Sequence, residues 1–325
     1  MIQRYYYFLC IMLLGLKSFS QNDSLLKPVT ENYFSFNYDN DFFSATDRYY
    51  TQGIKVTLIH PVIRYSPFSY GLIRLSKTAL NYYGLHAEQD VFTPKSIRYK
   101  GGAVYEGERP FTAVFFISHS LTSLNTQRKL LLRTQLDLGI LGPEAKGEEE
   151  QKGIHKAINN IEPLGWENQL SRDYIVNYSV QVEKGISMKR NRECMISLMA
   201  RVGTLYTDVG LGFNLRFGIF SPYFNNLGLE KDAALGRNDF KIYGIAKANG
   251  RLVGYNATLQ GGLTNSGNIY ELPDASVSRA VAYLSAGIVV AYKRVSLEYT
   301  KVYITPEFKN GVDHGWGKCV ITVCF

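Results

Sequence analysis

Three polar residues in a row, Asp39, Asn40 and Asp41, stand between two segments that alternate apolar and polar residues. Acidic residues and asparagine are poor strand formers, and a carboxylate that leaves water needs a proton, a cation or a hydrogen-bond donor. Carboxylate and amide oxygens suit a hard cation such as calcium, although the glycine and the final glutamate of an EF-hand loop are missing here. The triplet therefore has two interpretations, a polar turn or a cation site.

His155 is the histidine with the most suggestive neighbours. Its segment repeats Glu148, Gln151, His155 and Ile158 at three- and four-residue spacing, which is typical of a helix. Gln151 stands one helical turn before His155 and Glu162 follows shortly after it, so both can approach the imidazole. A neutral imidazole with a partner can serve as a general base, whereas a solvated acidic helix is the alternative. No G-x-S-x-G sequence indicates a conventional serine hydrolase.

Residues 1–20 have the order of a secretory signal peptide, with Arg4 followed by a short apolar run and then small residues. The run is too short to span a bilayer, so we expect cleavage near Ser20 and a single domain over residues 21–325. The formal net charge of +8 favours an anionic partner such as phosphate-bearing lipid. Export makes nucleic acid an unexpected partner. Three cysteines remain, an odd number, which implies no complete disulfide framework.

The C-terminal sequence "GKCVITVCF" indicates a membrane barrel. Cys319, Ile321, Val323 and Phe325 fall on one face of a strand. The chain ends on an aromatic residue, as the last strand of bacterial outer-membrane barrels commonly does. Aromatic residues make up 14% of the chain, with 24 tyrosines, which suits aromatic girdles around a barrel with a polar interior.

Segments with period-two alternation recur along the whole chain. An even number of antiparallel strands can close without a free edge, as a membrane requires. Turn signals occur at "KRNR", at "NG" before Arg251 and at "YKR". The pattern therefore predicts an all-β fold, a 12-stranded antiparallel barrel. The twelve expected strands begin near residues 31, 51, 112, 128, 172, 194, 209, 240, 251, 280, 294 and 318.

Two insertions interrupt this pattern, one from about Pro61 to Arg109 and one from Gly142 to Leu170. The second contains the helical segment around His155. Long ordered insertions in a barrel are more often functional than decorative. We therefore expect short helical insertions in the loops, with His155 on one of them.

Seven motifs can be recognised together along the chain. They are "DNDFF…TDRYYTQG" (39–53), "VFTP" (91–94), "ERPFTA" (108–113), "LGILGPEAKGEEEQKGIH…EPLGWENQL" (138–170), "GLGFNLRFG" (210–218), "YNATLQGG" (255–262) and "EYTKVYITPEF" (298–308). They keep their order and cover nearly the whole exported chain. In this ordered set the chain resembles the outer-membrane lipid A 3′-O-deacylase family.

The resemblance implies a twelve-stranded barrel in the outer membrane of a Gram-negative cell, with its active site between the barrel wall and extracellular loops. It also implies calcium-dependent removal of a 3′-linked acyl group from lipid A, with lipopolysaccharide and outer-membrane lipid as partners and a monomeric protein. Phe111 and Thr112 in "ERPFTA" stand where many relatives carry tyrosine and alanine. This departure leaves the exact lipid substrate open.

Functional residues can be carried over by position. Arg109 lies in a recurring motif, where binding of a substrate phosphate and a structural salt bridge are both reasonable roles. The expected catalytic residues are the paired Asn40 and Asp41, the strand hydroxyl of Thr51, the Gln-x-x-x-His pair Gln151 and His155, and the following acid Glu162, with Asp41 also the expected calcium ligand.

In the expected mechanism His155 takes a proton from water, and Gln151 or Glu162 orients the ring or the water. Asp41 holds calcium, while Asn40 and Thr51 help to bind the ester carbonyl as charge develops on it. An acyl-enzyme through Thr51 is less favoured, because nothing nearby in sequence would activate its hydroxyl. The alternatives are a non-catalytic barrel, acting as a pore or binding protein, and a soluble lectin-like β protein.

Overall fold

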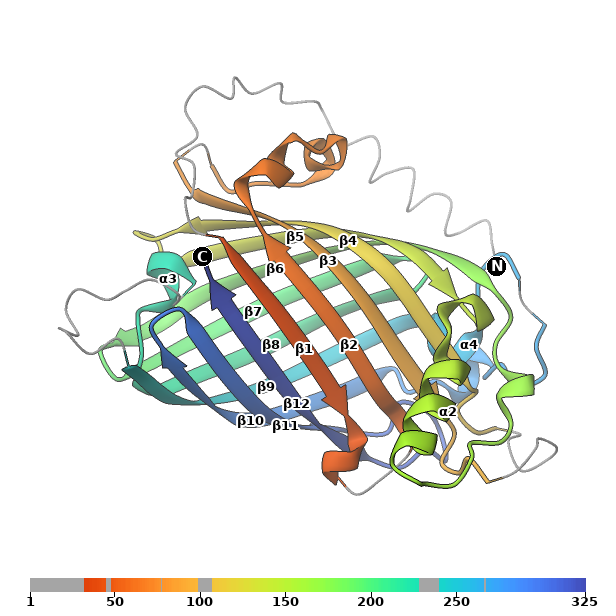
Figure 1. Cartoon of the computed structure of the whole chain (residues 1–325). Helices are drawn as coiled ribbons and strands as arrows, with labels where there is room; N and C mark the ends of the chain where they lie inside the picture. The colour runs from red at the N-terminus through yellow and green to blue at the C-terminus, as the bar shows by residue number, and fades with distance from the viewer. Residues whose placement is uncertain (1–31, 45–47, 77, 99–106, 228–239, 266) are drawn as a thin grey trace.

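A computed structural model describes residues 32–44, 48–76, 78–98, 107–227, 240–265 and 267–325. Twelve antiparallel strands close into a barrel, each paired with its neighbours in sequence and β1 paired with β12, which confirms the predicted fold (Figure 1). The expected signal peptide lies outside the described residues. The strands are β1 (Tyr33–Asn40), β2 (Tyr49–Ile59), β3 (Leu80–Thr93), β4 (Thr112–Asn125), β5 (Leu130–Leu141), β6 (Asp173–Lys189), β7 (Arg192–Gly203), β8 (Tyr206–Ile219), β9 (Phe240–Asn256), β10 (Ala280–Tyr292), β11 (Val295–Ile304) and β12 (His314–Cys324).

The predicted strand count is correct, but two predicted boundaries are wrong. Strand β3 occupies the middle of the expected insertion from Pro61 to Arg109. Its alternation is weak in sequence, because the outward-facing Gln89 is polar like its inward-facing neighbours Glu88 and Asp90. The turn expected before Arg251 does not form, since β9 continues through Gly250, which pairs with Ala282 of β10. The prediction missed β3 and divided β9 into two strands, so the predicted total of twelve is still correct.

Two other predicted turns are confirmed. Strand β6 ends at Lys189 and β7 begins at Arg192, as "KRNR" predicts. Strand β10 ends at Tyr292 and β11 begins at Val295, as "YKR" predicts. Within the described residues, helices long and apolar enough to span a bilayer are absent.

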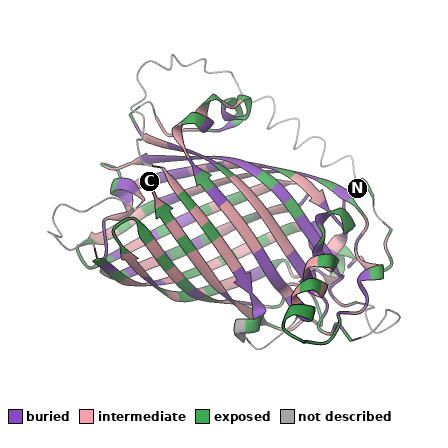
Figure 2. Ribbon diagram, viewed as in Figure 1, coloured by how far each residue is buried: buried purple, intermediate pink, exposed green. Residues whose placement is uncertain are grey.

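Side chains alternate between an apolar outer face and the lumen. Phe34 and Phe36 of β1 and Ile321 and Val323 of β12 are exposed on the outside of the barrel, as Figure 2 shows by the exposed positions along the strands. This is the outer surface that a bilayer requires. Asp39 has the opposite parity and faces the lumen, where the Tyr50 hydroxyl donates a hydrogen bond to its carboxylate at 3.1 Å.

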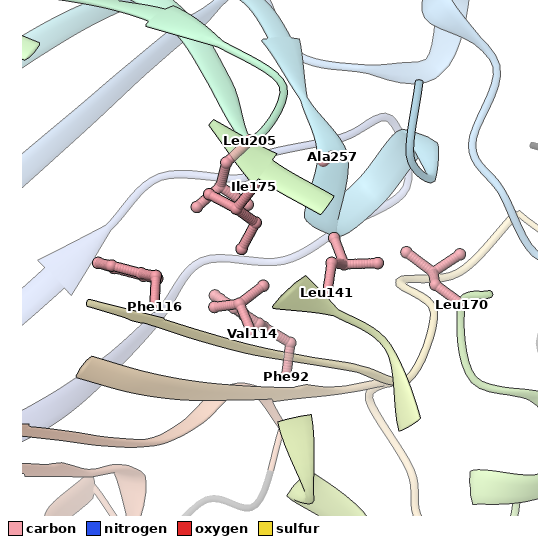
Figure 3. Packing of buried hydrophobic residues seen from close by; sticks show 8 residues of the cluster. All are labelled: Phe92, Val114, Phe116, Leu141, Leu170, Ile175, Leu205 and Ala257. Carbon is pink, nitrogen blue, oxygen red and sulfur yellow. The ribbon is translucent and has the colours of Figure 1, made fainter. Parts of the chain in front are cut away.

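The lumen is filled at two levels. Near one end, an apolar cluster that includes Phe92, Phe116 and Leu205 crosses the interior (Figure 3). Near the other end, Phe224 of the short helix α3 (Tyr223–Asn226) packs among inward residues such as Leu124. Packed apolar side chains therefore occupy part of the lumen at both levels.

The insertion from Gly142 to Leu170 contains the predicted helix. It folds as η6 (Pro143–Ala145), α2 (Gly147–Ala157) and η7 (Trp166–Asn168), and it lies against the outside of the wall near the ends of β2 and β3 (Figure 1). Trp166 and Ala145 pack on the outward-facing Val91 and Ala113. A Cβ added at Gly147 would lie 2.5 Å from the Ala113 Cβ, so glycine allows the start of α2 to approach the wall closely.

The two ends of the barrel differ. The end with α2 also has the short helices α4 (Ala257–Gln260) and η9 (Asp274–Ser276), while η3 (Pro61–Tyr65) and η4 (Pro67–Gly71) follow β2 at the end where β1 begins and β12 ends. Bacterial barrels have their longer loops on the cell surface. We therefore assign the end with α2 to the extracellular side.

Candidate active site

The first hairpin contributes one half of the site. Asn40 has the same parity as the exposed Phe34 and Phe36, so its side chain lies on the outer face, and its Nδ2 donates to the Tyr38 hydroxyl at 2.9 Å. Asp41 begins η2 (Asp41–Ser44), which ends the strand alternation. Asp39 and Asp41 therefore do not share a strand face.

Backbone donors hold both residues in place. The Asn40 Oδ1 accepts from the backbone N–H of Phe42 at 2.7 Å, and the Asp41 Oδ2 accepts from the N–H of Arg48 at 2.7 Å. Asp41 is buried at this junction. These bonds are those of a polar turn, the first interpretation of the triplet, and they also fix the orientation of the carboxylate and amide.

A β-bulge adds Thr51 to the same face. The pairing of β2 with β3 shifts between Tyr50 and Gln52, which leaves Thr51 as the extra residue. A bulge places two successive side chains near one face of the sheet. The Thr51 hydroxyl lies 2.8 Å from that of Thr93, while Gln52 stands opposite Asn40 in the register of β1 and β2. The structure thus brings Asn40, Thr51 and Gln52 together on the outer wall.

Helix α2 contributes the other half. The His155 Nδ1 lies 2.6 Å from the backbone carbonyl oxygen of Ile161. A carbonyl oxygen only accepts, so Nδ1 carries the proton in the neutral ring and Nε2 carries the lone pair. Sequence reasoning assigned the orienting role to Gln151 or Glu162. It missed the backbone carbonyl, because every residue has a carbonyl and the residue type therefore gives no signal for it.

Gln151 is fixed by the buried Trp166, whose Nε1 donates to the Gln151 Oε1 at 2.7 Å. This bond determines which way the amide faces, because the oxygen is held by a donor. Glu162 lies instead on the surface, with a 71% exposed side chain that is 3.7 Å from Lys152. Its catalytic role stays a prediction, as does that of Gln151.

Glu150 is a site residue that sequence reasoning did not select. Its neighbours Glu148 and Glu149 pair with lysines on the helix surface, whereas the Glu150 carboxylate accepts a hydrogen bond from Gln52 Nε2 of β2. Burial raises the pKa of Glu150 to about 7. The Glu150 Oε2 is buried and has no hydrogen-bond partner. Gln52 and Glu150 are thus a polar link between the hairpin half and the helix half.

Arg109 is placed apart from these residues. It is fully buried on the lumen side, over the ring of Phe92, and its guanidinium donates to Glu307 at 2.6 Å and to the Thr258 hydroxyl at 2.8 Å. This is the structural salt bridge that the sequence left as one of two roles. Binding of a substrate phosphate by Arg109 stays a prediction.

Calcium is the cation that the residues of this site are expected to hold. Across the described ranges, no group of three His, Cys, Asp or Glu side chains is arranged to hold a metal ion. The Asp41 carboxylate and the Asn40 amide oxygen are nonetheless adjacent hard donors, and calcium accepts backbone carbonyls and water among its six to eight ligands. The chemistry fits a cation held by few protein carboxylates.

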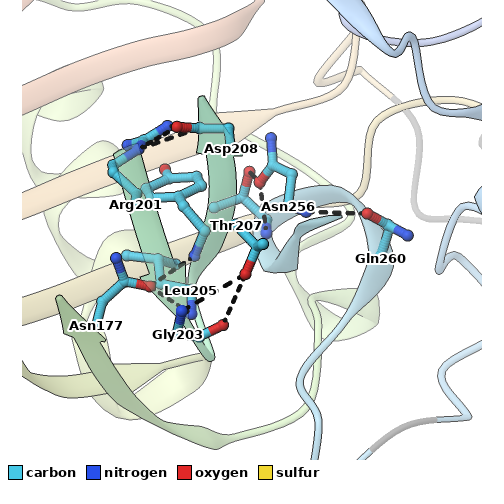
Figure 4. A network of polar contacts seen from close by, with 10 residues as sticks. Asn177, Arg201, Gly203, Leu205, Thr207, Asp208, Asn256 and Gln260 are labelled. Carbon is cyan, nitrogen blue, oxygen red and sulfur yellow. Dashed lines mark hydrogen bonds and ion pairs between the residues drawn. The ribbon is translucent and has the colours of Figure 1, made fainter. Parts of the chain in front are cut away.

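A cavity lies inside the barrel, on the opposite face of the wall from the candidate site, and we call it the lumen cavity. Its volume is about 240 Å³, and its lining includes Tyr50, Tyr206, Arg251 and Trp316. A polar network beside it joins the ends of β6 to β9, with Arg201 donating to Asp208 at 3.0 Å and Asn177 accepting from the backbone of Tyr206 at 2.9 Å (Figure 4). The lumen cavity and the outer-wall site are therefore separate.

Comparisons with known proteins agree with this geometry. Residues 7–325 match the family described as outer membrane protein LpxR. The chain belongs to the LpxR family. The solved structure of LpxR from Salmonella typhimurium is 22% identical, with a TM-score of 0.71 over 90% of this chain and 99% of that one, a likeness that shows the fold.

Other solved structures are less similar. The β domain of the Bordetella autotransporter BrkA is 8% identical, with a TM-score of 0.44 over 91% of this chain and 99% of that one. The COG4313 outer membrane channel from Pseudomonas putida F1 is 9% identical, with a TM-score of 0.46 over 92% and 97%. No curated protein sequence matches the chain. As a member of the LpxR family with this fold, the protein is an outer-membrane β-barrel, as predicted.

Proposed function

We propose that this LpxR-family barrel hydrolyses an acyl ester of lipid A, releasing the 3′-linked chain. The observation that carries the proposal is the position of His155, a histidine with a fixed tautomer on a helix that lies against the outward face of the first hairpin. That face is the one that meets the membrane. A lipid substrate in the outer leaflet can therefore reach the site from the side, without entering the lumen.

The chemistry begins with water. The His155 Nε2 takes a proton from a water molecule as the water oxygen attacks the ester carbonyl carbon. The carbonyl oxygen becomes an oxyanion, to which the Asn40 amide N–H and the Thr51 hydroxyl would donate. When the carbon–oxygen ester bond breaks, the His155 imidazolium returns its proton to the leaving sugar oxygen. The products are a fatty acid and a free hydroxyl on lipid A.

Calcium belongs to the same proposal. Asp41, with the Asn40 amide oxygen, would hold the ion, which when bound supplies positive charge to stabilise the oxyanion. The Thr51 hydroxyl shares a hydrogen bond with the hydroxyl of Thr93, which is not a base. This arrangement favours attack by water over an acyl-enzyme on Thr51.

The experiment is mass spectrometry of lipid A from cells that produce the wild-type protein, the His155→Ala variant or neither. We expect wild-type cells alone to accumulate lipid A that lacks the 3′-linked acyl group. Equal acylation in all three strains, with the barrel present in the outer membrane, would leave the non-catalytic barrel as the better interpretation. The side chains packed in the lumen already disfavour a pore as that alternative.

A further inference from the structure

The segment from Pro61 to Ser76 lies on the outside of the barrel, away from the candidate active site. It contains η3 and η4 and appears in Figure 1 as the orange helical turns outside the wall. Apolar contacts fix it, because Ile63 and Leu72 pack against Tyr83 and Leu121 of β3 and β4. We call residues 61–76 the outer-wall segment.

Hydrogen bonds join this segment to outward-facing polar residues of three strands. The Ser69 hydroxyl lies 2.8 Å from His119 Nε2, and the backbone N–H of Leu75 donates to the Ser123 hydroxyl at 3.0 Å. The Tyr178 hydroxyl donates to the carbonyl of Gly71 at 2.9 Å. Strands β4 and β6 therefore have polar side chains on their outer faces where the segment covers them.

His119 lies in the middle of β4, on the lipid-facing side of the wall. It pairs with Leu85 of β3, which pairs with Leu58 of β2, and Leu58 pairs with Phe34 of β1. These three partners are exposed apolar residues, as the lipid-facing surface of a barrel requires. His119 itself is 5% exposed, whereas Ile117, the preceding outward-facing residue of β4, is 54% exposed. An outward imidazole at this depth needs a polar partner, because hydrocarbon offers none.

The exposed surface of the segment is itself apolar and basic. It presents Val62, Tyr65, Phe68, Tyr70 and Ile73 outward, and Tyr70 is 89% exposed. The sixteen residues include two arginines and no acidic residue. Aromatic side chains beside cations are the composition of a membrane interface, where the rings meet acyl chains and the cations meet lipid phosphates.

We propose that the outer-wall segment is a membrane-embedded surface that binds glycerophospholipids of the periplasmic leaflet. The leaflet follows from the fold, since the segment starts where β2 ends on the side of the barrel termini and reaches His119 in the middle of β4. The aromatic side chains contact acyl chains, and Arg64 contacts the phosphate. This surface is on the opposite leaflet from the proposed ester-cleaving site and is independent of it.

The test uses the full-length barrel in vesicles of phosphatidylethanolamine and phosphatidylglycerol with brominated acyl chains. Tyr70→Trp adds a fluorophore to the outer-wall segment, and Ile269→Trp, at an 80% exposed position of an extracellular loop, is the matched control. We expect bromine to quench most of the emission added by Tyr70→Trp and little of that added by Ile269→Trp. Quenching of Tyr70→Trp by aqueous iodide instead would overturn the proposal.

A second readout tests the phosphate contact. Arg64→Gln should lower the amount of phosphatidylglycerol retained per barrel after detergent extraction, as counted by native mass spectrometry. Arg172→Gln, at an exposed arginine between the extracellular insertion and β6, should leave that amount unchanged. Equal retention of phosphatidylglycerol by both variants would contradict the proposed phosphate contact. Protection of Tyr70→Trp from bromine and iodide alike, with crosslinked dimers, would replace phospholipid by a second copy of the chain.

Discussion

His155 shows how a single residue gains a chemical role from its surroundings. The carbonyl of Ile161 accepts from Nδ1, so the lone pair that can receive a proton is on Nε2. A variant of this residue should therefore lower the reaction rate far more than the stability of the fold. The reason is that His155 belongs to none of the apolar clusters of the described residues.

We expect His155→Ala to lower the deacylation rate on the order of 10²-fold to 10⁴-fold, the usual cost of losing a general base. The measurement is fatty acid release from purified lipopolysaccharide by the refolded barrel. His314→Ala is the control, since His314 lies at the lumen cavity. Wild-type rates in His155→Ala would refute the assignment of the base.

The acidic triplet gives a second prediction at this scale. If Asp41 holds calcium, Asp41→Ala should abolish calcium binding measured by calorimetry and raise the calcium needed for activity or remove activity. Asp39→Asn should bind calcium like the wild type, because Asp39 faces the lumen and bonds to Tyr50. A chelator-resistant activity in metal-free protein would contradict the calcium role, whatever the effect of the substitutions.

At the scale of elements, the site depends on how helix α2 lies against the first hairpin. Gly147 permits the close approach of the helix to Ala113, and the hydrogen bond between Gln52 and Glu150 joins the helix to β2. The proposed catalytic histidine is on one element and the expected oxyanion donors are on the other. Their separation is therefore set by these contacts rather than by either element alone.

Glu150 makes this junction sensitive to pH. Its ordinary pKa is 4.5 and burial raises it to about 7, so the folded protein holds this proton more tightly than the unfolded chain does. Relative to Glu150→Gln, the wild type should be most stable below pH 4.5 and should lose that contribution as the pH rises to about 7. Thermal unfolding at pH 4 and pH 8 measures the difference, and a difference that grows in the opposite direction would contradict the assignment.

The link itself can be tested by a double-mutant cycle. Gln52→Ala and Glu150→Ala should each lower kcat, and the double variant should cost less than the sum of the two, because both remove one interaction. Glu150→Gln should recover part of the loss, since its amide oxygen can still accept from Gln52. Additive effects would show that the two residues act separately.

At the scale of the whole molecule, the β-sheet closes into a barrel, and packed side chains lie in its interior. The cluster around Phe116 and the packing of Phe224 among inward residues occupy the lumen at two levels. The site lies outside the wall, so catalysis needs no passage through the interior. We propose that the barrel acts as a monomer, because both halves of the site come from one chain.

These features predict two behaviours in membranes. The protein should fractionate with the outer membrane and migrate differently on gels before and after boiling, because a closed barrel resists detergent unfolding. In planar bilayers it should show no stepwise conductance of the kind that porins give. Stable ion-conducting steps would show that the lumen opens, and they would favour the pore alternative.

The sequence by itself determined the class of fold and selected most of the candidate site residues. Period-two alternation, the terminal strand ending on Phe325 and the helical spacing around His155 are local patterns, and they predicted a twelve-stranded barrel with a helical extracellular insertion. The ordered motifs selected Asn40, Asp41 and Thr51. Local patterns suffice here because the two faces of a membrane strand meet different surroundings.

Tertiary structure decided what depends on partners distant in sequence. It directs Glu150 towards Gln52, while Glu148 and Glu149 stay on the helix surface. The three residues are of the same type, so residue type alone does not distinguish them. It also gave the orienting contact of His155 to a backbone carbonyl. The outward polar side chain of His119 is tolerated only because Ser69 covers it. Each of these outcomes depends on which surface lies opposite the residue, and only the closed, folded barrel brings those surfaces together.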